Sequence, residues 1–265
     1  MIFPVVGEAR YTNDFGDPRS QGSHQGNDIM APRHSIAVAA EAGTVKFHTT
    51  SWAAGCMLYL YGQSGTTYLY IHLNNDLGKA NDNRGKCVPG TAYAPGLRSG
   101  AKVAAGQAVG FVGDSGDANG VAPHVHFEMH PRNGGATNPF PHLNRAARIL
   151  FASAPGKRFT LALNGSVSAT LTGRLDLRVS SLRSYPGGTL VTNVARTLSI
   201  SVPGSALVEK VVNGIAAALG YGSLTSARKG QAVQVWTAPA PATLDAQLGR
   251  SGSLSAERVV LGKKP

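Results

Sequence analysis

Glycine and proline interrupt this chain so often that long helices are disfavoured. The 265 residues include 33 Gly and 15 Pro, and only 15% of the residues are charged. Between the interruptions lie short runs in which apolar and polar residues alternate, which is the period of a half-buried strand. Because glycine and proline favour tight turns, we expect a mainly β fold built from antiparallel hairpins.

The chain is long enough for one large domain or two of ordinary size. Strand-like runs on either side of turn signals predict hairpins at residues 36–47 and 57–71 in the first half. Residues 153–157, Ser-Ala-Pro-Gly-Lys, have the composition of a linker. We therefore expect an antiparallel β-sheet domain over residues 1–150, followed by a smaller mixed, mainly β domain over residues 151–265.

Two segments of the second half predict particular elements. Residues 159–163 and 167–171 alternate around Asn164-Gly165, a dipeptide typical of two-residue hairpin turns. We expect the chain to reverse there. Residues 206–219 place Leu, Val and Ile at helical spacing and end before a glycine, so we expect a helix over this segment.

The formal net charge of +11 is carried mostly by the second half. Residues 1–150 contain 12 Lys/Arg and 10 Asp/Glu, whereas residues 151–265 contain 13 and 4, which gives +2 and +9. This asymmetry indicates an anionic partner for the second half, such as a cell-wall polymer, a membrane surface or nucleic acid; a solvated basic surface is the alternative. Nucleic acid is disfavoured because few aromatic residues and no groove-reading motif follow residue 150.

The sequence contains no sign of a membrane-spanning helix. No apolar run approaches the roughly 20 residues that a helix needs to cross a bilayer. The N-terminal segment from Met1 to Gly7 has no basic stretch followed by an apolar one, which a signal peptide would require. We expect that a signal peptide has been removed from a mature form.

Residues 74–100 are rich in Asn, Asp, Gly, Pro and Lys and show no period, which predicts a long loop after His72. Long loops in compact domains are commonly functional, so we expect this one to form a wall of a substrate groove. Cys87 lies in the loop, and Cys56 lies in a strand-like run. Neither has the CxxC spacing of a metal or redox site, and both a disulfide and two unrelated thiols remain open.

Four histidines and one aspartate fall into three short motifs that could bind a metal ion. The motifs are His24-Gln25-Gly26-Asn27-Asp28, Tyr70-Ile71-His72-Leu73 and Pro123-His124-Val125-His126-Phe127-Glu128. A catalytic zinc takes about three ligands of the His, Asp or Glu type and keeps one position open for water. It also needs groups that move protons, so three ligands and two further imidazoles would meet its requirements.

The third motif has the clearest geometry. His124 and His126 lie two residues apart, so in a strand they point to the same face. Val125, Phe127 and Met129 then face the core, and the histidine pair supplies one ligand and one neighbouring imidazole. An isolated pair of this kind is more often two exposed polar residues.

The other two motifs carry little information on their own. Nearby glycines disfavour a helix around His24, so we expect a turn that aims His24 and Asp28 inward; alone, this pattern is typical of a polar surface loop. His72 ends a strand before a polar loop, a common place for a catalytic group. Tyr70 is assigned to sheet packing. Four histidines lack such context and receive no role: His34, His48, His130 and His142.

In this order and with these flanks, the motifs resemble the lysostaphin-type, or LytM-like, zinc endopeptidases of bacterial cell walls. The resemblance covers about residues 3–142 and does not extend past about residue 150. It departs from the family at Arg33-His34-Ser35-Ile36 and in the long loop after His72. Further matching segments are Asn13 to Arg19, Ala31-Pro32, Glu41 to Val45, Gly106 to Gly110 and Asn138-Pro139.

The resemblance implies that His24, Asp28 and His126 bind one zinc ion per chain. It implies that His72 and His124 are catalytic residues beside the metal, without saying which is the base and which the acid. Two neutral imidazoles and one carboxylate would leave the site with a net charge of about +1, which lowers the pKa of a bound water toward neutrality.

The implied function is hydrolysis of peptide bonds in peptidoglycan stems or cross-bridges by a secreted or cell-envelope enzyme. We expect a monomer whose basic second domain binds anionic cell-wall polymers. The alternative is a catalytically silent relative that binds the wall or activates another hydrolase. Such a relative would be expected to lack a ligand, and all five site residues are present here.

Overall fold

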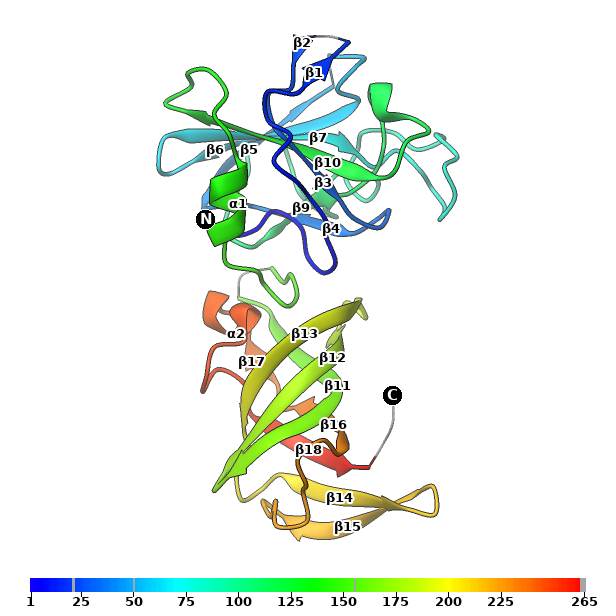
Figure 1. The fold of residues 1–265 in the computed structure, drawn as a ribbon, viewed down its shortest axis with the longest axis vertical. Helices are drawn as coiled ribbons and strands as arrows, with labels where there is room; N and C mark the ends of the chain where they lie inside the picture. The colour runs from blue at the N-terminus through cyan, green and yellow to red at the C-terminus, as the bar shows by residue number, and fades with distance from the viewer. Residues whose placement is uncertain (21, 50, 155, 263–265) are drawn as a thin grey trace. The chain divides into compact units, whose positions relative to one another are not determined.

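The chain divides into two compact units in the computed structural model, Met1–Ala152 and Ser153–Pro265 (Figure 1). The structure describes residues 1–20, 22–49, 51–154 and 156–262. Both units consist mainly of antiparallel strands, which confirms the expected fold class. Within the described ranges, no helix has the length and apolar character needed to cross a membrane.

A six-stranded antiparallel sheet forms the centre of the first unit, with the strand order β3-β10-β7-β6-β5-β8. Two small ladders, β1-β2 and β4-β9, accompany it. The sheet strands are β3 (Asn27–Met30), β5 (Gly43–His48), β6 (Cys56–Gly62), β7 (Thr66–Leu73), β8 (Lys102–Val103) and β10 (His124–Pro131). The remaining elements are β1 (Pro18–Arg19), β2 (Gly22–Ser23), β4 (Ile36–Val38), β9 (Ala108–Phe111), the 3-10 turn η1 (Gly116–Ala118) and α1 (Phe140–Arg145).

Side chains along β10 point alternately into the core and toward the site. Val125 and Phe127 are fully buried and Met129 is 5% exposed, as the sequence parity predicted. The Phe127 ring packs edge-on against Tyr70 of β7, with ring centroids 5.2 Å apart. Each large apolar side chain buried in this way contributes roughly 1.5–3 kcal/mol. The burial of these side chains therefore fixes the orientation of β10, and with it the direction in which the residues on the opposite face point.

Tyr70 is a packing residue, as expected from the sequence. Its side chain is fully buried. Its hydroxyl donates to the Val38 carbonyl oxygen and accepts from the Ala40 N–H, both at 2.9 Å. Burial raises the pKa of the Tyr70 phenol, so the hydroxyl stays protonated and joins β7 to the segment after β4.

The long loop of residues 74–100 contains no named strand, and a disulfide and a buried ion pair are among the contacts that fasten it to the rest of the unit. Cys87 forms a disulfide with Cys56 of β6, with Cα atoms 5.1 Å apart. Asp76 is buried, pairs with the Arg33 guanidinium and accepts two backbone N–H groups from the loop. Arg33, where the sequence departs from the family pattern, therefore has a structural partner.

The second unit is one twisted sheet with the order β13-β12-β11-β16-β18-β14-β15, and β17 pairs with β11 off this path. All pairs are antiparallel except β14 and β18. The strands are β11 (Arg158–Leu171), β12 (Arg174–Tyr185), β13 (Leu190–Ser201), β14 (Leu207–Val212), β15 (Ile215–Tyr221), β16 (Ala232–Thr237), β17 (Ala240–Pro241) and β18 (Ala256–Leu261). One short helix, α2 (Leu244–Leu248), is capped by the Thr243 hydroxyl, which accepts the Ala246 N–H.

The prediction of a hairpin at Asn164-Gly165 is wrong. β11 runs without interruption through both residues and pairs with β12 on one side and β16 on the other. The register shifts at this dipeptide, which marks a bulge. A Cβ on Gly165 would collide with the Arg178 carbonyl oxygen. Glycine is therefore needed here because β11 and β12 approach closely, and it does not form a turn.

The prediction of a helix over residues 206–219 is also wrong, because this segment forms the β14-β15 hairpin. The chain reverses at Asn213-Gly214, where both residues have positive φ, 51° and 81°. An Asn-Gly pair in this conformation is the usual two-residue hairpin turn. The apolar residues on either side fit a helical period and a strand pair equally well, and the turn chemistry decides between them.

We predict that the disulfide stabilises the first unit by constraining its unfolded state. Closing a loop of about 30 residues is expected to contribute roughly 3–4 kcal/mol to the free energy of unfolding. Urea unfolding should be followed by near-ultraviolet circular dichroism, to which the buried Tyr70 and Tyr93 of this unit contribute, with and without reductant. Reduction and the Cys87→Ser substitution should lower the midpoint equally, and reductant should not affect Cys87→Ser further. Equal midpoints for the oxidised and reduced chains would contradict this prediction.

Candidate metal centre and cleft

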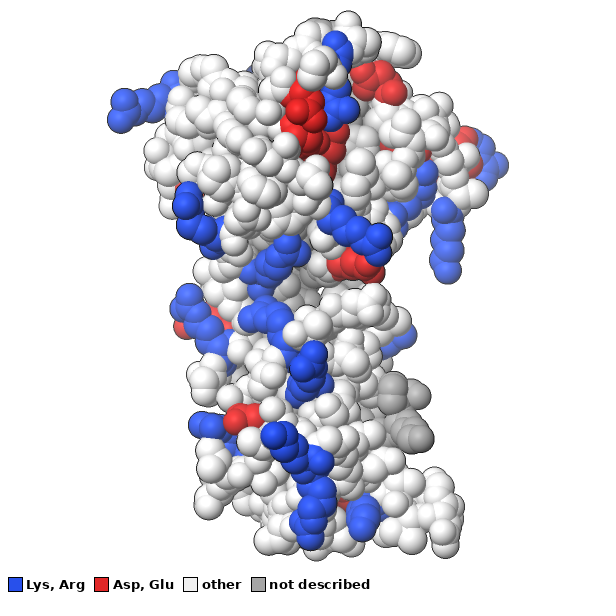
Figure 2. All heavy atoms as spheres, in the orientation of Figure 1, with Lys and Arg blue, Asp and Glu red and all other residues white. Residues whose placement is uncertain are grey.

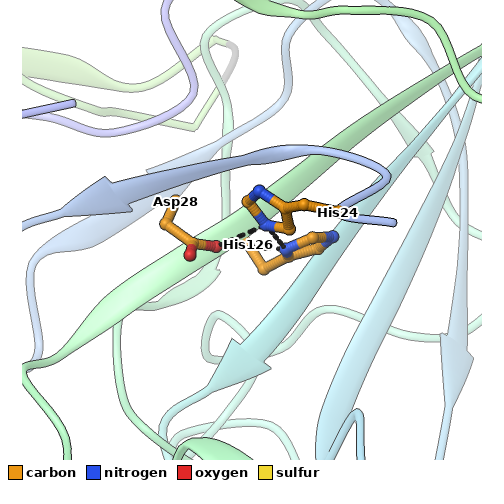
Figure 3. Close-up of side chains that lie close together, drawn as sticks. All are labelled: His24, Asp28 and His126. Carbon is orange, nitrogen blue, oxygen red and sulfur yellow. Dashed lines mark hydrogen bonds and ion pairs between the residues drawn. The ribbon is translucent and has the colours of Figure 1, made fainter. Parts of the chain in front are cut away.

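His24, Asp28 and His126 converge at one point (Figure 3). Asp28 on β3 is the direct register partner of His126 on β10. His24 Nε2 lies 2.8 Å from His126 Nδ1 and 3.1 Å from Asp28 Oδ1. His126 Nδ1 lies 3.1 Å from the same carboxylate oxygen. Two ring nitrogens and one oxygen thus face a common centre, which is the donor set that zinc takes in catalytic sites.

A glycine makes this convergence possible. A Cβ on Gly26 would lie 2.5 Å from the Phe127 carbonyl oxygen and 2.8 Å from His126 Nε2. Any larger residue would push the turn that carries His24 away from β10. This contact gives a physical reason for the glycine between His24 and Asp28 in the first motif.

Hydrogen bonds on the outer ring nitrogens orient both histidines. His24 Nδ1 donates to the Asp14 carbonyl oxygen at 2.7 Å, and His126 Nε2 donates to Glu128 Oε1 at 2.9 Å. Because the outer nitrogen carries the proton in each ring, the inner nitrogen is left with its lone pair toward Asp28 when the ring is neutral. Carbonyl and carboxylate partners of this kind are common behind metal-binding histidines.

The charges of the centre are strongly coupled. Burial by itself raises the pKa of Asp28, but the hydrogen bond from His126 and the neighbouring His124 and His24 outweigh it and hold the pKa well below its usual range. Burial by itself lowers the pKa of His126, but hydrogen bonds to Asp28 and Glu128 raise it to about 9. The arrangement favours positive charge at the point where the three side chains meet.

His72 and His124 lie beside this centre. Their ring centroids are 5.1 Å apart, and the His72 centroid is 6.1 Å from that of His126. His72 Nδ1 donates to the Ser115 carbonyl oxygen at 2.8 Å, and His124 Nδ1 donates to the Ala122 carbonyl oxygen at 2.9 Å. Both rings therefore keep Nε2 available to accept a proton.

The environment of His72 keeps its ring neutral. His72 is 9% exposed. Burial, followed by the nearby His124, lowers its pKa to about 4. At neutral pH this imidazole is therefore a proton acceptor.

These side chains lie in one cleft of about 590 Å³. The long loop of residues 74–100, expected to form a wall of the groove, contributes no residue to the lining, so that expectation is wrong. The loop is held elsewhere by the Cys56–Cys87 disulfide and the Arg33–Asp76 pair. The lining residues are Arg19, Ser20, Gly22, Ser23, His24, Gln25, Asp28, Met30, Ser51, Ala53, Ala54, Ile71, His72, Asp117, Ala118, Val121, His124, His126 and Glu128.

Sequence reasoning assigned no role to several residues around the centre. Glu128 is 9% exposed and bridges His126 Nε2 at 2.9 Å and His130 Nε2 at 2.6 Å. Strand parity could have found His130, since it shares a face of β10 with the site histidines. Arg19 Nη2 lies 3.0 Å from Asp28 Oδ2. The sequence around Arg19 does not predict this contact.

No protein-family model matches the chain. A similar protein in sequence is the L-Ala–D-Glu endopeptidase of Bacillus subtilis strain 168, which is 27% identical over 152 residues. The match covers 53% of this chain and 41% of that protein, so the chain spans less than half of the relative's length.

Two solved structures are similar to about half of this chain. The catalytic domain of lysostaphin from Staphylococcus simulans is 22% identical, with 52% of this chain and 92% of that chain covered and a TM-score of 0.39. A zinc-containing peptidase from Vibrio cholerae is 21% identical, with 58% and 40% covered and a TM-score of 0.38. Because both TM-scores lie below 0.5, we take the relationship from the sequence match and the motifs. The first unit of this chain is similar in sequence to an endopeptidase, and its motifs resemble those of the lysostaphin-type, LytM-like peptidases.

Proposed function

We propose that this protein is a zinc-dependent endopeptidase that hydrolyses peptide bonds in peptidoglycan stems or cross-bridges. The convergence of His24, Asp28 and His126, with His72 and His124 beside them in one cleft, carries the proposal. The sequence match to an endopeptidase and the order of the three motifs support it.

The three converging side chains fit a catalytic zinc ion. His24 Nε2, His126 Nδ1 and Asp28 Oδ1 supply two nitrogens and one oxygen, and three protein donors leave a position for water. A zinc ion bound there would lower the pKa of a water molecule and polarise the scissile carbonyl. Glu128 and the Asp14 carbonyl would hold the two ligand rings in orientation.

His72 and His124 are proposed to move the protons of the reaction. Each donates Nδ1–H to a backbone carbonyl, so its Nε2 can take a proton from the attacking water and return it to the leaving amine. Both side chains are buried where they border the cleft, and hydrogen bonds act there in a low dielectric. Either ring can serve in either step.

The second unit is proposed to bind anionic cell-wall polymers. It carries 13 Lys/Arg against 4 Asp/Glu, counted over residues 151–265. Figure 2 shows Lys and Arg side chains along the visible face of this unit, with few acidic ones. Arg174, Arg178 and Arg183 lie on the exposed side of β12, while Leu175 and Leu177 point into the core. A polymer bearing phosphates or carboxylates would be attracted to this surface.

The protein is proposed to act in the cell envelope or outside the cell. Its disulfide between Cys56 and Cys87 would persist in an oxidising compartment and would be reduced in a bacterial cytosol. Peptidoglycan is located in the same compartment.

The zinc assignment predicts that metal content and cleavage are lost together. Wild-type protein should bind about one zinc per chain and release fragments from purified peptidoglycan. The His126→Ala variant should lose most of its zinc and lower cleavage by about 10³-fold or more, because it removes a ligand. His142→Ala, an exposed histidine on α1, is the control and should match wild type. Zinc would be measured by elemental analysis, and full cleavage by zinc-free His126→Ala would refute the assignment.

The lowered pKa of His72 predicts a pH dependence for the metal-free protein. The ordinary pKa of a histidine is 6.5, and the pKa of His72 in the folded protein is about 4. As the pH falls, the unfolded chain therefore binds a proton at this residue before the folded chain does. Stability from the neutral ring is present above about pH 6.5 and is lost between about pH 6.5 and 4, by up to about 3 kcal/mol. His72→Gln should flatten this slope in urea unfolding followed by near-ultraviolet circular dichroism, to which the buried Tyr70 and Tyr93 contribute.

Other groups of the centre act in different pH windows. The raised pKa of His126 affects stability above pH 6.5, and the lowered pKa values of Asp28 and Glu128 act below about pH 4.5. An unchanged slope in His72→Gln between pH 6.5 and 4.5 would therefore contradict the neutral state of His72.

The basic surface predicts salt-sensitive binding to cell walls. Replacing Arg178 and Arg183 by Gln should weaken binding of the full chain to purified walls by roughly 3- to 10-fold at low salt and reduce its salt dependence. The double variant Arg10→Gln and Arg84→Gln, at exposed positions in the first unit, is the charge-matched control. This effect can be measured by cosedimentation with cell walls at several salt concentrations. Equal binding by wild type and by the variant lacking both arginines would contradict the proposed surface.

A further inference from the structure

The β14-β15 hairpin exposes apolar side chains at the edge of the second unit. Among the described strands β15 pairs only with β14, and all its residues from Ile215 to Leu219 are exposed. Ile215 is 72% exposed, Tyr221 69% and Val212 52%. Edge strands of soluble proteins are commonly protected by charges or proline, and β15 has neither. An exposed apolar surface of this kind indicates that a partner covers it.

Two apolar side chains lie at the tip of the hairpin, which comprises residues 211–216. Val212 and Ile215 are direct register partners on either side of the Asn213-Gly214 turn, so their side chains lie on the same face. In the part of the chain that the structure describes, β18 pairs with β14 only at residues 207–210, so the tip extends past this neighbour. Figure 1 shows the turn at the free end of the hairpin.

Lys210 lies directly behind the tip. It is exposed, and it shares a face of β14 with Val212, two residues further along the strand. A long lysine side chain can keep its ammonium group in a polar layer while the residues ahead of it enter an apolar one. The preceding acidic residue, Glu209, is 8% exposed and pairs with the Arg258 guanidinium. The exposed charge at the base of the tip is therefore positive.

The loop after β15 adds two further positive charges beside the hairpin. Arg228 and Lys229 are exposed in this loop. The loop returns to β14, because a Cβ on Gly262 would lie 3.9 Å from both the Gln231 side chain and the Val211 side chain. The apolar tip is thus accompanied by basic residues from two segments of the chain.

We propose that the hairpin tip inserts into the surface of a lipid bilayer that carries anionic headgroups. Residues 210–244 contain no Asp or Glu, so this region attracts a negative surface and repels a second copy of the chain. Apolar side chains accompanied by Lys and Arg are typical of segments that bind in the membrane interface. Tyr221 adds an aromatic side chain of the type enriched there.

This surface differs from the one proposed to bind cell-wall polymers. That surface includes Arg178 and Arg183 of β12, and strands β11, β16 and β18 lie between β12 and β14 in the sheet. Insertion of the tip also requires no metal ion and no peptide cleavage. The proposal therefore goes beyond the endopeptidase function and can be tested independently of it.

Binding of the full chain to lipid vesicles tests the proposal. Vesicles of phosphatidylcholine mixed with phosphatidylglycerol would be compared, by cosedimentation, with vesicles of phosphatidylcholine alone. Wild type should bind the anionic vesicles about tenfold or more tightly than the neutral ones. The double variant Val212→Ser and Ile215→Ser should weaken binding to anionic vesicles by about tenfold or more, because both apolar side chains are lost from the tip.

Two exposed leucines elsewhere in the second unit provide the matched control. Leu171 at the end of β11 is 54% exposed, and Leu190 at the start of β13 is 51% exposed. The double variant Leu171→Ser and Leu190→Ser should bind both kinds of vesicle as wild type does. Unweakened binding by the tip variant would overturn the proposal, and so would an equal loss in the control.

A fluorescent side chain at the tip measures insertion separately from attraction. Ile215→Trp should show quenching by lipids with brominated acyl chains beyond that of wild type, whose Trp52 and Trp236 supply the baseline. Lys210→Gln should weaken binding to anionic vesicles by roughly 3- to 5-fold and leave binding to neutral vesicles unchanged. Binding without additional quenching in Ile215→Trp would mean that the tip stays outside the bilayer, which contradicts the proposal.

Two other occupants of the hairpin give different results. If the tip binds a wall polymer, the tip variant loses cosedimentation with purified, lipid-free cell walls and keeps its binding to vesicles. If a second copy covers the hairpin, sedimentation velocity shows a dimer in wild type that the tip variant lacks. Either result overturns the proposal, which predicts wild-type wall binding for the tip variant and the same sedimentation coefficient for both proteins.

Discussion

The register between β3 and β10 is the constraint on which the site depends. It sets Asp28 directly opposite His126, and the same pairing sets Ile29 opposite Val125 in the core. A slip of one residue would turn His126 into the core and expose Phe127. Ile29, Val125 and Phe127 are all fully buried, so the hydrophobic core holds the geometry of the polar face. The energy that orders the site comes from the side of the sheet that takes no part in chemistry.

Hydrogen bonds from the backbone then orient the imidazoles. The carbonyl groups of Asp14, Ser115 and Ala122 each accept a ring N–H, from His24, His72 and His124 respectively. A carbonyl oxygen can only accept, so it determines which nitrogen carries the proton. Three of the four histidines are thus oriented by main chain, and His126 is oriented by Glu128. Rings held in this way need little rearrangement when a metal ion or a substrate arrives.

Much of the site could be predicted from sequence, and the reasons are specific. The parity of His124 and His126 follows from the two-residue period of a strand. The convergence with His24 and Asp28 does not follow from spacing, because it depends on a turn brought close to β10 by Gly26. It was anticipated only through the resemblance to known peptidases. Arg19 had no local signal, since its contacts with Asp14 and Asp28 arise from tertiary folding.

The second unit was predicted less well. Asn164-Gly165 and Asn213-Gly214 are the same dipeptide, yet the first lies within a continuous strand and the second forms a turn. The difference lies in the partners: β11 is flanked by β12 and β16, and close approach of β12 requires a glycine there. Local sequence does not contain this information, because the neighbouring strands are distant in the chain.

The central claim is that one zinc ion is bound by His24, Asp28 and His126, and anomalous diffraction at the zinc edge from crystals of the zinc-loaded chain tests it most directly. Our account predicts one anomalous peak about 2.0–2.2 Å from His24 Nε2, His126 Nδ1 and an Asp28 carboxylate oxygen. An absent peak at this position, or a peak bound by other side chains, would contradict it.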